Sequence, residues 1–313
     1  MELDHVEAFV AIVRRGGFTR ASAVLHLSQP AISRRIHSPG AGAGGAALRA
    51  DPDGHHPDRG WPAFLPHAEA LLASMRDGVE AVGALRGADR GTVTLAVVGT
   101  LASPPLSDRL RQFREAAPAV DLLIRTGLSV EVSALVRRGD ATLGLRYQRD
   151  PDPDLVSEPV HQEAMVPVCG PGHRLAGARR VAPSALAGER WVAFPARPAT
   201  AAPEAYSTAL QERLAACGLG GAEVLPIDSL TAQKRMVEAG FGLALLPASS
   251  VDEEIRAGTL RVLAVPALRV TIPVVLVRRR RAFLSGAARV LASLLASWPS
   301  VGPEPRDGPG SRR

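Results

Sequence analysis

Polar side chains near the N-terminus have the chemistry to recognise a nucleic acid. They comprise an amide, two hydroxyls and three guanidinium groups, with a proline among them: Arg20, Ser28, Gln29, Pro30, Ser33, Arg34 and Arg35. An amide pairs with base edges, whereas hydroxyl and guanidinium groups suit phosphate oxygens. The net charge of +6 allows a polyanionic partner without identifying it. We therefore take double-stranded DNA as the candidate ligand of this segment, and a solvated basic face as the alternative.

A second group of polar side chains is spread over the later part of the sequence. Each member follows a predicted strand or begins a predicted helix; the residues are Thr100, Ser103, Thr126, Ser129, Phe194 and Ser229. Hydroxyls and free backbone N–H groups at such positions suit a small carboxylate or similar anion. Any one of them is equally well explained as a helix cap. Together they predict a pocket for a small-molecule effector.

The sequence contains no recognisable pattern for catalysis or metal binding. A nucleophile elbow, a phosphate-binding glycine loop and paired carboxylates are all missing. Cys169 and Cys217 match no metal-ligand spacing and are expected to be reduced, structural thiols. The basic run Arg278–Arg281 follows a predicted strand and is expected to be a solvated corner. We therefore expect neither an enzyme nor a bound metal or cofactor.

Three short helices are predicted around the N-terminal group. Apolar residues recur every three or four positions over residues 3–13, which indicates a helix that ends at Gly16 and Gly17. A second helix is expected with Thr19 as its N-cap, and a third with Ser28 as its N-cap. The third helix would present its polar residues near its N-terminus, as the recognition helix of a helix-turn-helix does.

The sequence of residues 3–36 closely resembles the DNA-binding signature of LysR-type transcriptional regulators; it reads LDHVEAFVAIVRRGGFTRASAVLHLSQPAISRRI. A later string, MVEAGFGLALLPASSV, resembles a segment typical of the effector domain of that family. The resemblance implies a winged helix-turn-helix, a long linker helix and a two-lobed α/β domain similar to type II periplasmic binding proteins. It also implies promoter or operator DNA, a small-molecule effector and RNA polymerase as partners, and a cytoplasmic location.

Residues 38–62 depart from the family pattern. They read SPGAGAGGAALRADPDGHHPDRGWP, and their Gly and Pro content opposes both helix and strand. The family has a Leu-Glu-x-x-Leu-Gly-x-x-Leu-Phe run and a basic wing of the same length here. Two compensating frameshifts account for the replacement, because reading the back-translated codons one base later can restore that run; a genuine Gly/Pro loop is the alternative. We expect this segment to be poorly ordered.

The next segment, residues 63–90, is predicted to be a linker and dimerisation helix. Its apolar residues alternate in steps of three and four, as in a coiled coil: Leu65, Ala68, Leu72, Met75, Val79 and Val82. The alternative is an amphipathic helix that packs on its own chain. Because two-fold DNA half-sites need a two-fold protein, we expect a homodimer or homotetramer.

The predicted fold class is therefore α+β and multidomain. The helix-turn-helix domain covers residues 1–62 and the effector domain covers residues 91–300, where short apolar runs alternate with helical patterns. Lobe I is expected over about 91–164 and 268–300, and lobe II over about 165–267. A disordered tail is expected over 301–313.

Two other functions are compatible with parts of the sequence. A stand-alone solute-binding protein would share the two lobes, but the N-terminal reader and the lack of an export signal argue against it. A dimeric small-molecule-binding protein whose DNA reader is disabled by residues 38–62 is the stronger alternative. No apolar run approaches the roughly 20 residues needed to cross a bilayer, so no membrane partner is expected.

Overall fold

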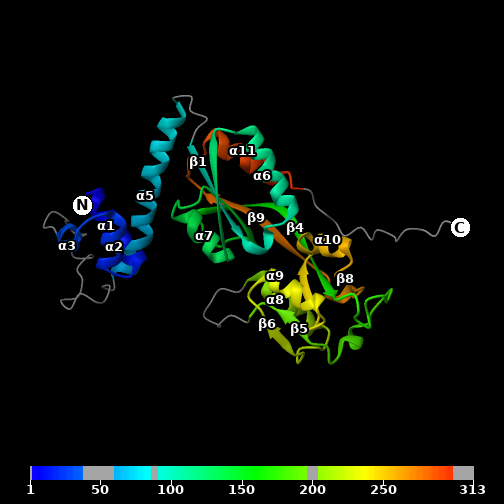
Figure 1. Ribbon diagram of the computed structural model, residues 1–313. Coiled ribbons are helices and arrows are strands. Elements are labelled where there is room, and N and C mark those ends of the chain that lie inside the picture. The colour runs from blue at the N-terminus through cyan, green and yellow to red at the C-terminus, as the bar shows by residue number, and fades with distance from the viewer. Residues whose placement is uncertain (1, 38–59, 86–90, 196–203, 299–313) are drawn as a thin grey trace.

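The computed structural model describes residues 2–37, 60–85, 91–195 and 204–298. Figure 1 shows three parts in chain order: a group of short helices, one long helix, and an α/β domain with two lobes. Of the atypical segment 38–62, which the sequence predicts to be poorly ordered, residues 38–59 lie outside the described residues, as does the tail at 301–313. The prediction is wrong for residues 60–62, which form the start of the long helix, because the Trp61 ring packs on Phe9 of the N-terminal helices. The two-lobed α/β domain after a helical N-terminus confirms the predicted fold class.

The N-terminal part consists of α1 (Leu3–Arg15), α2 (Phe18–Leu25) and α3 (Gln29–His37). Phe9, Ile32 and Ile36 are fully buried between these helices, as the apolar periodicity requires. Ser28 caps α3, because its hydroxyl accepts the Ala31 N–H at 3.3 Å.

The predicted N-cap of α2 is wrong. The helix begins at Phe18, so Thr19 lies inside it, and Gly17 takes the capping position with φ of +145°. Glycine adopts this backbone conformation without steric cost, which allows the helix to start two residues earlier than predicted. The Ala21 N–H then donates to the Gly17 carbonyl at 3.1 Å.

The long helix α5 (Gly60–Leu85) begins three residues before the predicted start of the linker, and its two halves have different surroundings. In the first half, Ala68 and Leu72 are buried against the N-terminal helices, and the rings of Trp61 and Phe64 pack on Phe9. From Leu71 onward, four large apolar residues are 41–67% exposed: Leu71, Met75, Val79 and Val82. The apolar residues predicted to form one coiled-coil seam are therefore packed against the N-terminal helices at the start of α5 and exposed towards its end.

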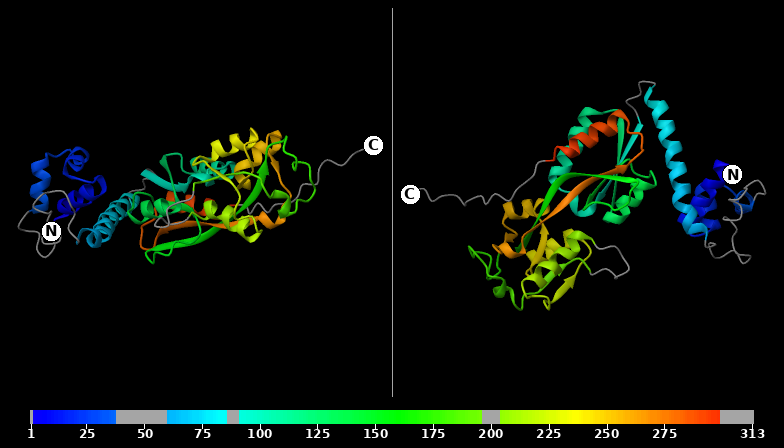
Figure 2. Two further views of the ribbon diagram at one scale, coloured as in Figure 1. Left: turned by 90° about the horizontal axis from the view of Figure 1, so that it is seen from below. Right: turned by 180° about the vertical axis from the view of Figure 1, so that it is seen from behind.

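Charged contacts attach α5 to the effector domain, and Figures 1 and 2 show α5 between the N-terminal helices and lobe I. The Arg279 guanidinium donates to both carboxylate oxygens of Asp77, at 2.7 and 2.8 Å. Arg278 pairs with Glu158 at 2.9 Å. These two arginines of the basic run are ion-paired, so the expectation of a purely solvated corner is wrong. Their partners come from α5 and from a neighbouring strand, and the sequence around the arginines does not reveal them.

A mixed sheet of seven strands runs through both lobes. Its order is β2-β1-β3-β9-β4-β7, with β8 also paired to β4. The strands are β1 (Gly91–Val98), β2 (Val120–Gly127), β3 (Leu143–Tyr147), β4 (Leu155–Cys169), β7 (Ala244–Pro247), β8 (Arg261–Val262) and β9 (Val270–Arg279). Strand β1 is parallel to β2 and β3, whereas β4 and β9 form a long antiparallel pair that joins the lobes.

Helices cover the sheet in each lobe. Those of lobe I are α6 (Pro104–Ala116), α7 (Ser129–Arg137) and α11 (Gly286–Ala296); those of lobe II are α8 (Ala205–Ala216), α9 (Leu230–Glu238) and α10 (Ala248–Ala257). Lobe II also contains the parallel pair β5 (Trp191–Ala193) and β6 (Val224–Pro226). Short 3-10 helices span Gly99–Leu101, Pro183–Leu186 and Pro266–Leu268.

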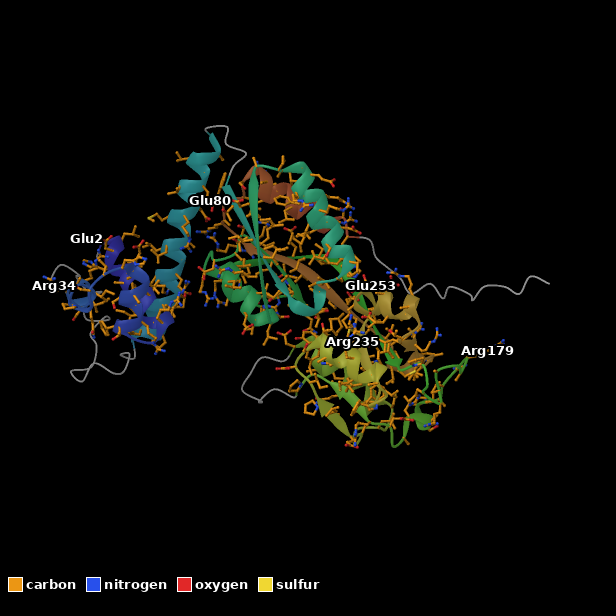
Figure 3. All side chains as sticks on the ribbon, in the orientation of Figure 1. Glu2, Arg34, Glu80, Arg179, Arg235 and Glu253 are labelled. Atoms are coloured by element: carbon orange, nitrogen blue, oxygen red, sulfur yellow. The ribbon has the colours of Figure 1, made fainter. Side chains whose placement is uncertain are left out.

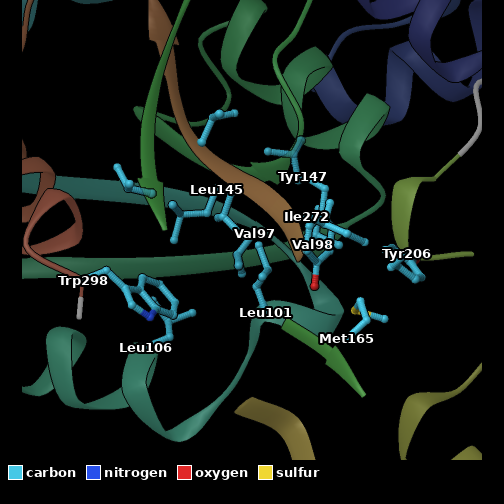
Figure 4. Packing of buried hydrophobic residues seen from close by; sticks show 14 of the residues in the cluster. Val97, Val98, Leu101, Leu106, Leu145, Tyr147, Met165, Tyr206, Ile272 and Trp298 are labelled. Atoms are coloured by element: carbon cyan, nitrogen blue, oxygen red, sulfur yellow. The ribbon is translucent and has the colours of Figure 1, made fainter. Parts of the chain in front are cut away.

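The main core lies between the sheet and the helices of lobe I. Val97, Leu145 and Leu101 are fully buried there, with Tyr147 and Trp298 at its edges (Figure 4). Burial on both faces of β1 explains its continuous apolar run. Within the described ranges, no helix combines the length and apolarity needed to span a bilayer.

Gly242 permits a close backbone approach that assembles the core of lobe II. Its φ is +157°, and a Cβ added there would lie 2.5 Å from the Arg190 carbonyl oxygen. That carbonyl accepts the Leu243 N–H at 2.9 Å, and the Leu243 carbonyl accepts the Val192 N–H.

We predict that Gly242→Ala lowers the free energy of unfolding by about 2–3 kcal/mol, because the backbone must move or the hydrogen bonds must break. Gly172→Ala is the matched control, since nothing lies within 4 Å of its added Cβ. Urea denaturation monitored by circular dichroism measures both. Equal midpoints for the two variants would contradict the assigned role of Gly242.

Candidate functional site

A cavity of about 910 Å³ lies between the two lobes. Five of the six residues predicted to form the pocket line it: Thr100, Ser103, Thr126, Phe194 and Ser229. They come from four segments that are far apart in the sequence: the stretch after β1, the end of β2, the residue after β5 and the N-cap of α9. The structure therefore brings these side chains to a single space, where one small molecule could contact both lobes.

The topology of the sheet explains why these hydroxyls meet. Strands β1 and β2 are parallel neighbours, so their carboxyl ends open onto the same edge. Thr100 follows β1, and its hydroxyl donates to the Tyr147 hydroxyl at 3.1 Å. Thr126 is near the end of β2, and Ser229 caps α9 by accepting the Ala232 N–H at 3.4 Å. Each residue thus serves the fold and also faces the cavity.

Ser129 is the predicted pocket residue that does not line the cavity. It begins α7 in lobe I, and its N–H and hydroxyl donate to the Glu204 carboxylate of lobe II, at 2.5 and 2.8 Å. Both residues are buried. The N–H and hydroxyl of Ser129, which the sequence predicted to bind an effector, are therefore already hydrogen-bonded to a carboxylate of the same protein.

A second buried carboxylate makes the same kind of contact at α10. The Ser249 N–H and hydroxyl donate to the Glu163 carboxylate of β4, at 3.3 and 2.8 Å. Sequence analysis missed both glutamates. The only signal for Glu163 was a carboxylate beside the apolar run of β4, and Glu204 stands in no recognisable pattern.

Buried polar groups behind the cavity have shifted acidities. Burial raises the pKa of Tyr147 well above its usual value, and the nearby Glu163 carboxylate raises it further, so the phenol stays protonated. Burial also raises the pKa of the Cys169 thiol to about 11. Cys169 and Cys217 are both free thiols, as expected from the sequence. A protonated, buried thiol has little nucleophilic reactivity.

The charges around the cavity are mostly negative. Its lining includes four carboxylates, Asp108, Glu131, Asp228 and Glu253. Among the described residues of the lining, the single cation is Lys234, which is ion-paired with Glu254 at 2.6 Å. Figure 3 shows Glu253 where α10 approaches lobe I.

The predicted DNA-reading residues lie on or beside α3. Gln29, Pro30 and Arg34 are exposed, and Figure 3 shows Arg34 at the outer end of the molecule. Arg35 pairs with Asp4 at 3.0 Å, and Arg20 donates to the Gly16 carbonyl at 2.7 Å.

Ser28 and Ser33 are less available than these exposed residues. The Ser28 hydroxyl is used as the cap of α3, and Ser33 is half-buried and engaged in a contact of its own. The most accessible groups for DNA are therefore the Gln29 amide and the Arg34 guanidinium.

Helix α7 connects the cleft to the N-terminal helices. Its first residue, Ser129, binds Glu204 at the cleft. Beyond its last turn, Asp140 pairs with Arg14 of α1 at 3.1 Å, and the Arg138 carbonyl accepts from Arg76 of α5. A displacement of α7 at the cleft would therefore act directly on the linker helix and on the DNA-reading part.

We predict that Ser129→Ala lowers the free energy of unfolding by about 2 kcal/mol, because it removes a donor from a buried carboxylate. The control is Ser107→Ala, which removes an exposed hydroxyl of the cavity lining. Thermal and urea denaturation of both variants test this. A Ser129→Ala protein as stable as the control would show that the Glu204 contact contributes little.

Two family models match this chain. Residues 86–299 match the LysR substrate binding domain, and residues 3–38 match the bacterial regulatory helix-turn-helix protein of the lysR family. Among curated proteins, the SDS degradation transcriptional activation protein of a Pseudomonas species is 32% identical over 271 residues, which cover 84% of each chain. HTH-type transcriptional regulator CfxR of Cupriavidus necator is 26% identical and covers 85% of this chain and 81% of its own length.

Solved structures share the whole architecture. A full-length OxyR variant from Pseudomonas aeruginosa superposes with a TM-score of 0.71 over 94% of each chain, at 16% identity. This similarity shows a common fold that includes the helix-turn-helix, the linker helix and both lobes. Since the effector-domain model alone spans more than half of the residues, the chain belongs to the LysR family of transcriptional regulators.

Proposed function

We propose that this regulator binds a small-molecule effector in the cavity between its lobes, and that effector binding changes how it binds promoter or operator DNA. The observation that carries the proposal is the convergence of Thr100, Ser103, Thr126 and Ser229, from both lobes, on one cavity of about 910 Å³. A ligand that contacts both lobes stabilises their closed arrangement over any open one.

DNA binding is assigned to α3. Its exposed Gln29 amide suits a base edge in the major groove, and the exposed Arg34 guanidinium suits a phosphate. The structure titled full-length CbnR complexed with its target DNA supports this placement; it superposes with a TM-score of 0.62 at 19% identity, over 94% of this chain and 99% of that one. RNA polymerase at the same promoter is a further proposed partner, and the proposed location is the cytoplasm.

The uncovered part of α5 is proposed to pair with a second copy of the chain. Leu71, Met75, Val79 and Val82 form an exposed apolar row there, and such rows pack against each other in two-stranded coiled coils. A dimer would place two copies of α3 on the two halves of a palindromic site. A tetramer would join two such dimers.

We propose that α7 transmits the effector signal. Its N-terminus is held by Glu204 at the cleft, and the turn after it is held by Arg14 and Arg76. A ligand that changes the position of Glu204 relative to lobe I therefore changes a helix that contacts α1 and α5. The cleft end of the coupling consists of two hydrogen bonds to Glu204, and the other end consists of two separate contacts, one with Arg14 and one with Arg76.

Two variants of α3 separate base reading from phosphate contact. Gln29→Ala should remove discrimination at one base pair, worth about 1–3 kcal/mol on cognate DNA, and leave binding to random DNA unchanged. Arg34→Ala should weaken binding to both DNAs alike and reduce the salt dependence by about one ion. Fluorescence anisotropy with promoter and scrambled duplexes at several salt concentrations distinguishes them. Equal losses on both duplexes for Gln29→Ala would refute its role in base reading.

Breaking the contact between Asp140 and Arg14 should uncouple the two sites. In the native protein, binding of promoter DNA should change hydrogen exchange in cleft peptides around residues 99–108 and 126–131, because coupling between sites is reciprocal. In Asp140→Asn that change should be lost while DNA is still bound. Asp252→Asn is the control, since it affects an exposed ion pair with Arg256 in lobe II. An unchanged exchange response in Asp140→Asn would exclude this route.

A further inference from the structure

The groups best suited to bind an anion in the cleft are already satisfied by the protein. Glu204 and Glu163, exposed by only 2% and 1%, accept the N–H and hydroxyl groups at the starts of α7 and α10. An incoming carboxylate would have to displace a buried carboxylate from each pair of donors. The expectation of an anionic effector rested on hydroxyl and N–H groups at six positions, and one of these, Ser129, is already bound to Glu204.

The charge of the lining opposes an anion as well. Four carboxylates, those of Asp108, Glu131, Asp228 and Glu253, line the cavity, and Lys234 is neutralised by Glu254. Like charges at about 4 Å repel by roughly 1 kcal/mol in water and more in a partly enclosed site. A ligand carboxylate would meet this repulsion with no unpaired cation in the described lining to offset it.

The remaining lining groups suit a cation. Phe194 and Tyr206 form a T-shaped aromatic pair on one wall, with ring centroids 4.8 Å apart. Aromatic faces attract ammonium and guanidinium groups, more strongly where water is partly excluded. The hydroxyls of Thr100, Ser103 and Thr126 can accept hydrogen bonds from such groups. Carboxylates, aromatic faces and hydroxyls together form a site for a small organic cation.

We propose that the effector of this regulator carries an ammonium or guanidinium group that binds among the carboxylates of the inter-lobe cavity. This inference rests on the proposed function, since it names the ligand class of the same cavity. Glu131 from lobe I, whose carboxylate also accepts the Leu128 N–H at 2.8 Å, and Asp228 from lobe II both line the cavity and are the carboxylates proposed to contact the cation. Binding to both would hold the lobes together.

Calorimetric titration of the full chain with three probes of one carbon skeleton tests the charge. The probes are putrescine, succinamide and succinate, which carry positive, zero and negative charge. Putrescine should bind, and Glu131→Gln and Asp228→Asn should each weaken it about ten-fold, the effect of losing roughly 1.4 kcal/mol of attraction. Glu115→Gln, an exposed carboxylate of α6 outside the cavity, should leave its affinity unchanged.

Each other outcome overturns the proposal. If succinate bound more tightly than putrescine, the cavity would still be an effector site, but one that prefers an anion. The proposed function would then stand, and the proposal of a cationic effector would be wrong. Putrescine binding that is equal in all variants would place the cation elsewhere. A simple cation among four carboxylates should bind with a dissociation constant of roughly 20 mM or lower. If putrescine did not bind at that concentration, the proposal would also be rejected. Failure of the proposed function itself would appear separately, as an absence of promoter binding.

Discussion

The antiparallel pairing of β4 with β9 is the interaction on which the rest of the effector domain depends. It extends from Leu155 opposite Arg279 to Met165 opposite Val270, with one irregularity between Pro159 and His161. Both strands pass from one lobe to the other, so they connect the two lobes along one side, and the cavity lies between the lobes. Irregularities of this kind bend a strand locally, so this is the natural place for the lobes to move relative to each other.

In the proposed function, the contacts across the cleft would pass a movement of the lobes to the N-terminal helices. Glu204 and Ser129 join lobe II to the first residue of α7, and the Asp140 pair with Arg14 joins the turn after α7 to the N-terminal helices. Arg279, at the end of β9, holds α5 by a two-point ion pair with Asp77. A partly buried two-point contact of this type fixes orientation as well as distance. The linker helix is thus attached to the two elements whose positions the lobes control.

Patterns local in the sequence predicted much of the fold and the site. Helical periodicity and the Ser28 cap identified α3. Five of the six residues predicted to form the pocket line the cavity, and those that follow β1 and end β2 meet because the carboxyl ends of parallel strands share one edge of the sheet. The contacts of Ser129 with Glu204 and of Arg279 with Asp77 were not predictable, since the partners are 75 and 202 residues apart. The negative charge of the cavity comes from four carboxylates spread from residue 108 to residue 253, those of Asp108, Glu131, Asp228 and Glu253. Local patterns did not bring them together, which is why the sequence suggested an anion whereas the effector proposed from the structure is a cation.

The central claim is that the chain reads DNA as a dimer despite the atypical segment 38–62. A nuclease footprint of the purified full chain on the DNA upstream of its own gene tests this most directly. The proposed function predicts two protected half-sites separated by about one helical turn, roughly 10 base pairs, or a multiple of it, at concentrations that leave random DNA unprotected. Protection no stronger than on random DNA would contradict it, and would instead support a small-molecule-binding dimer whose DNA reader is disabled.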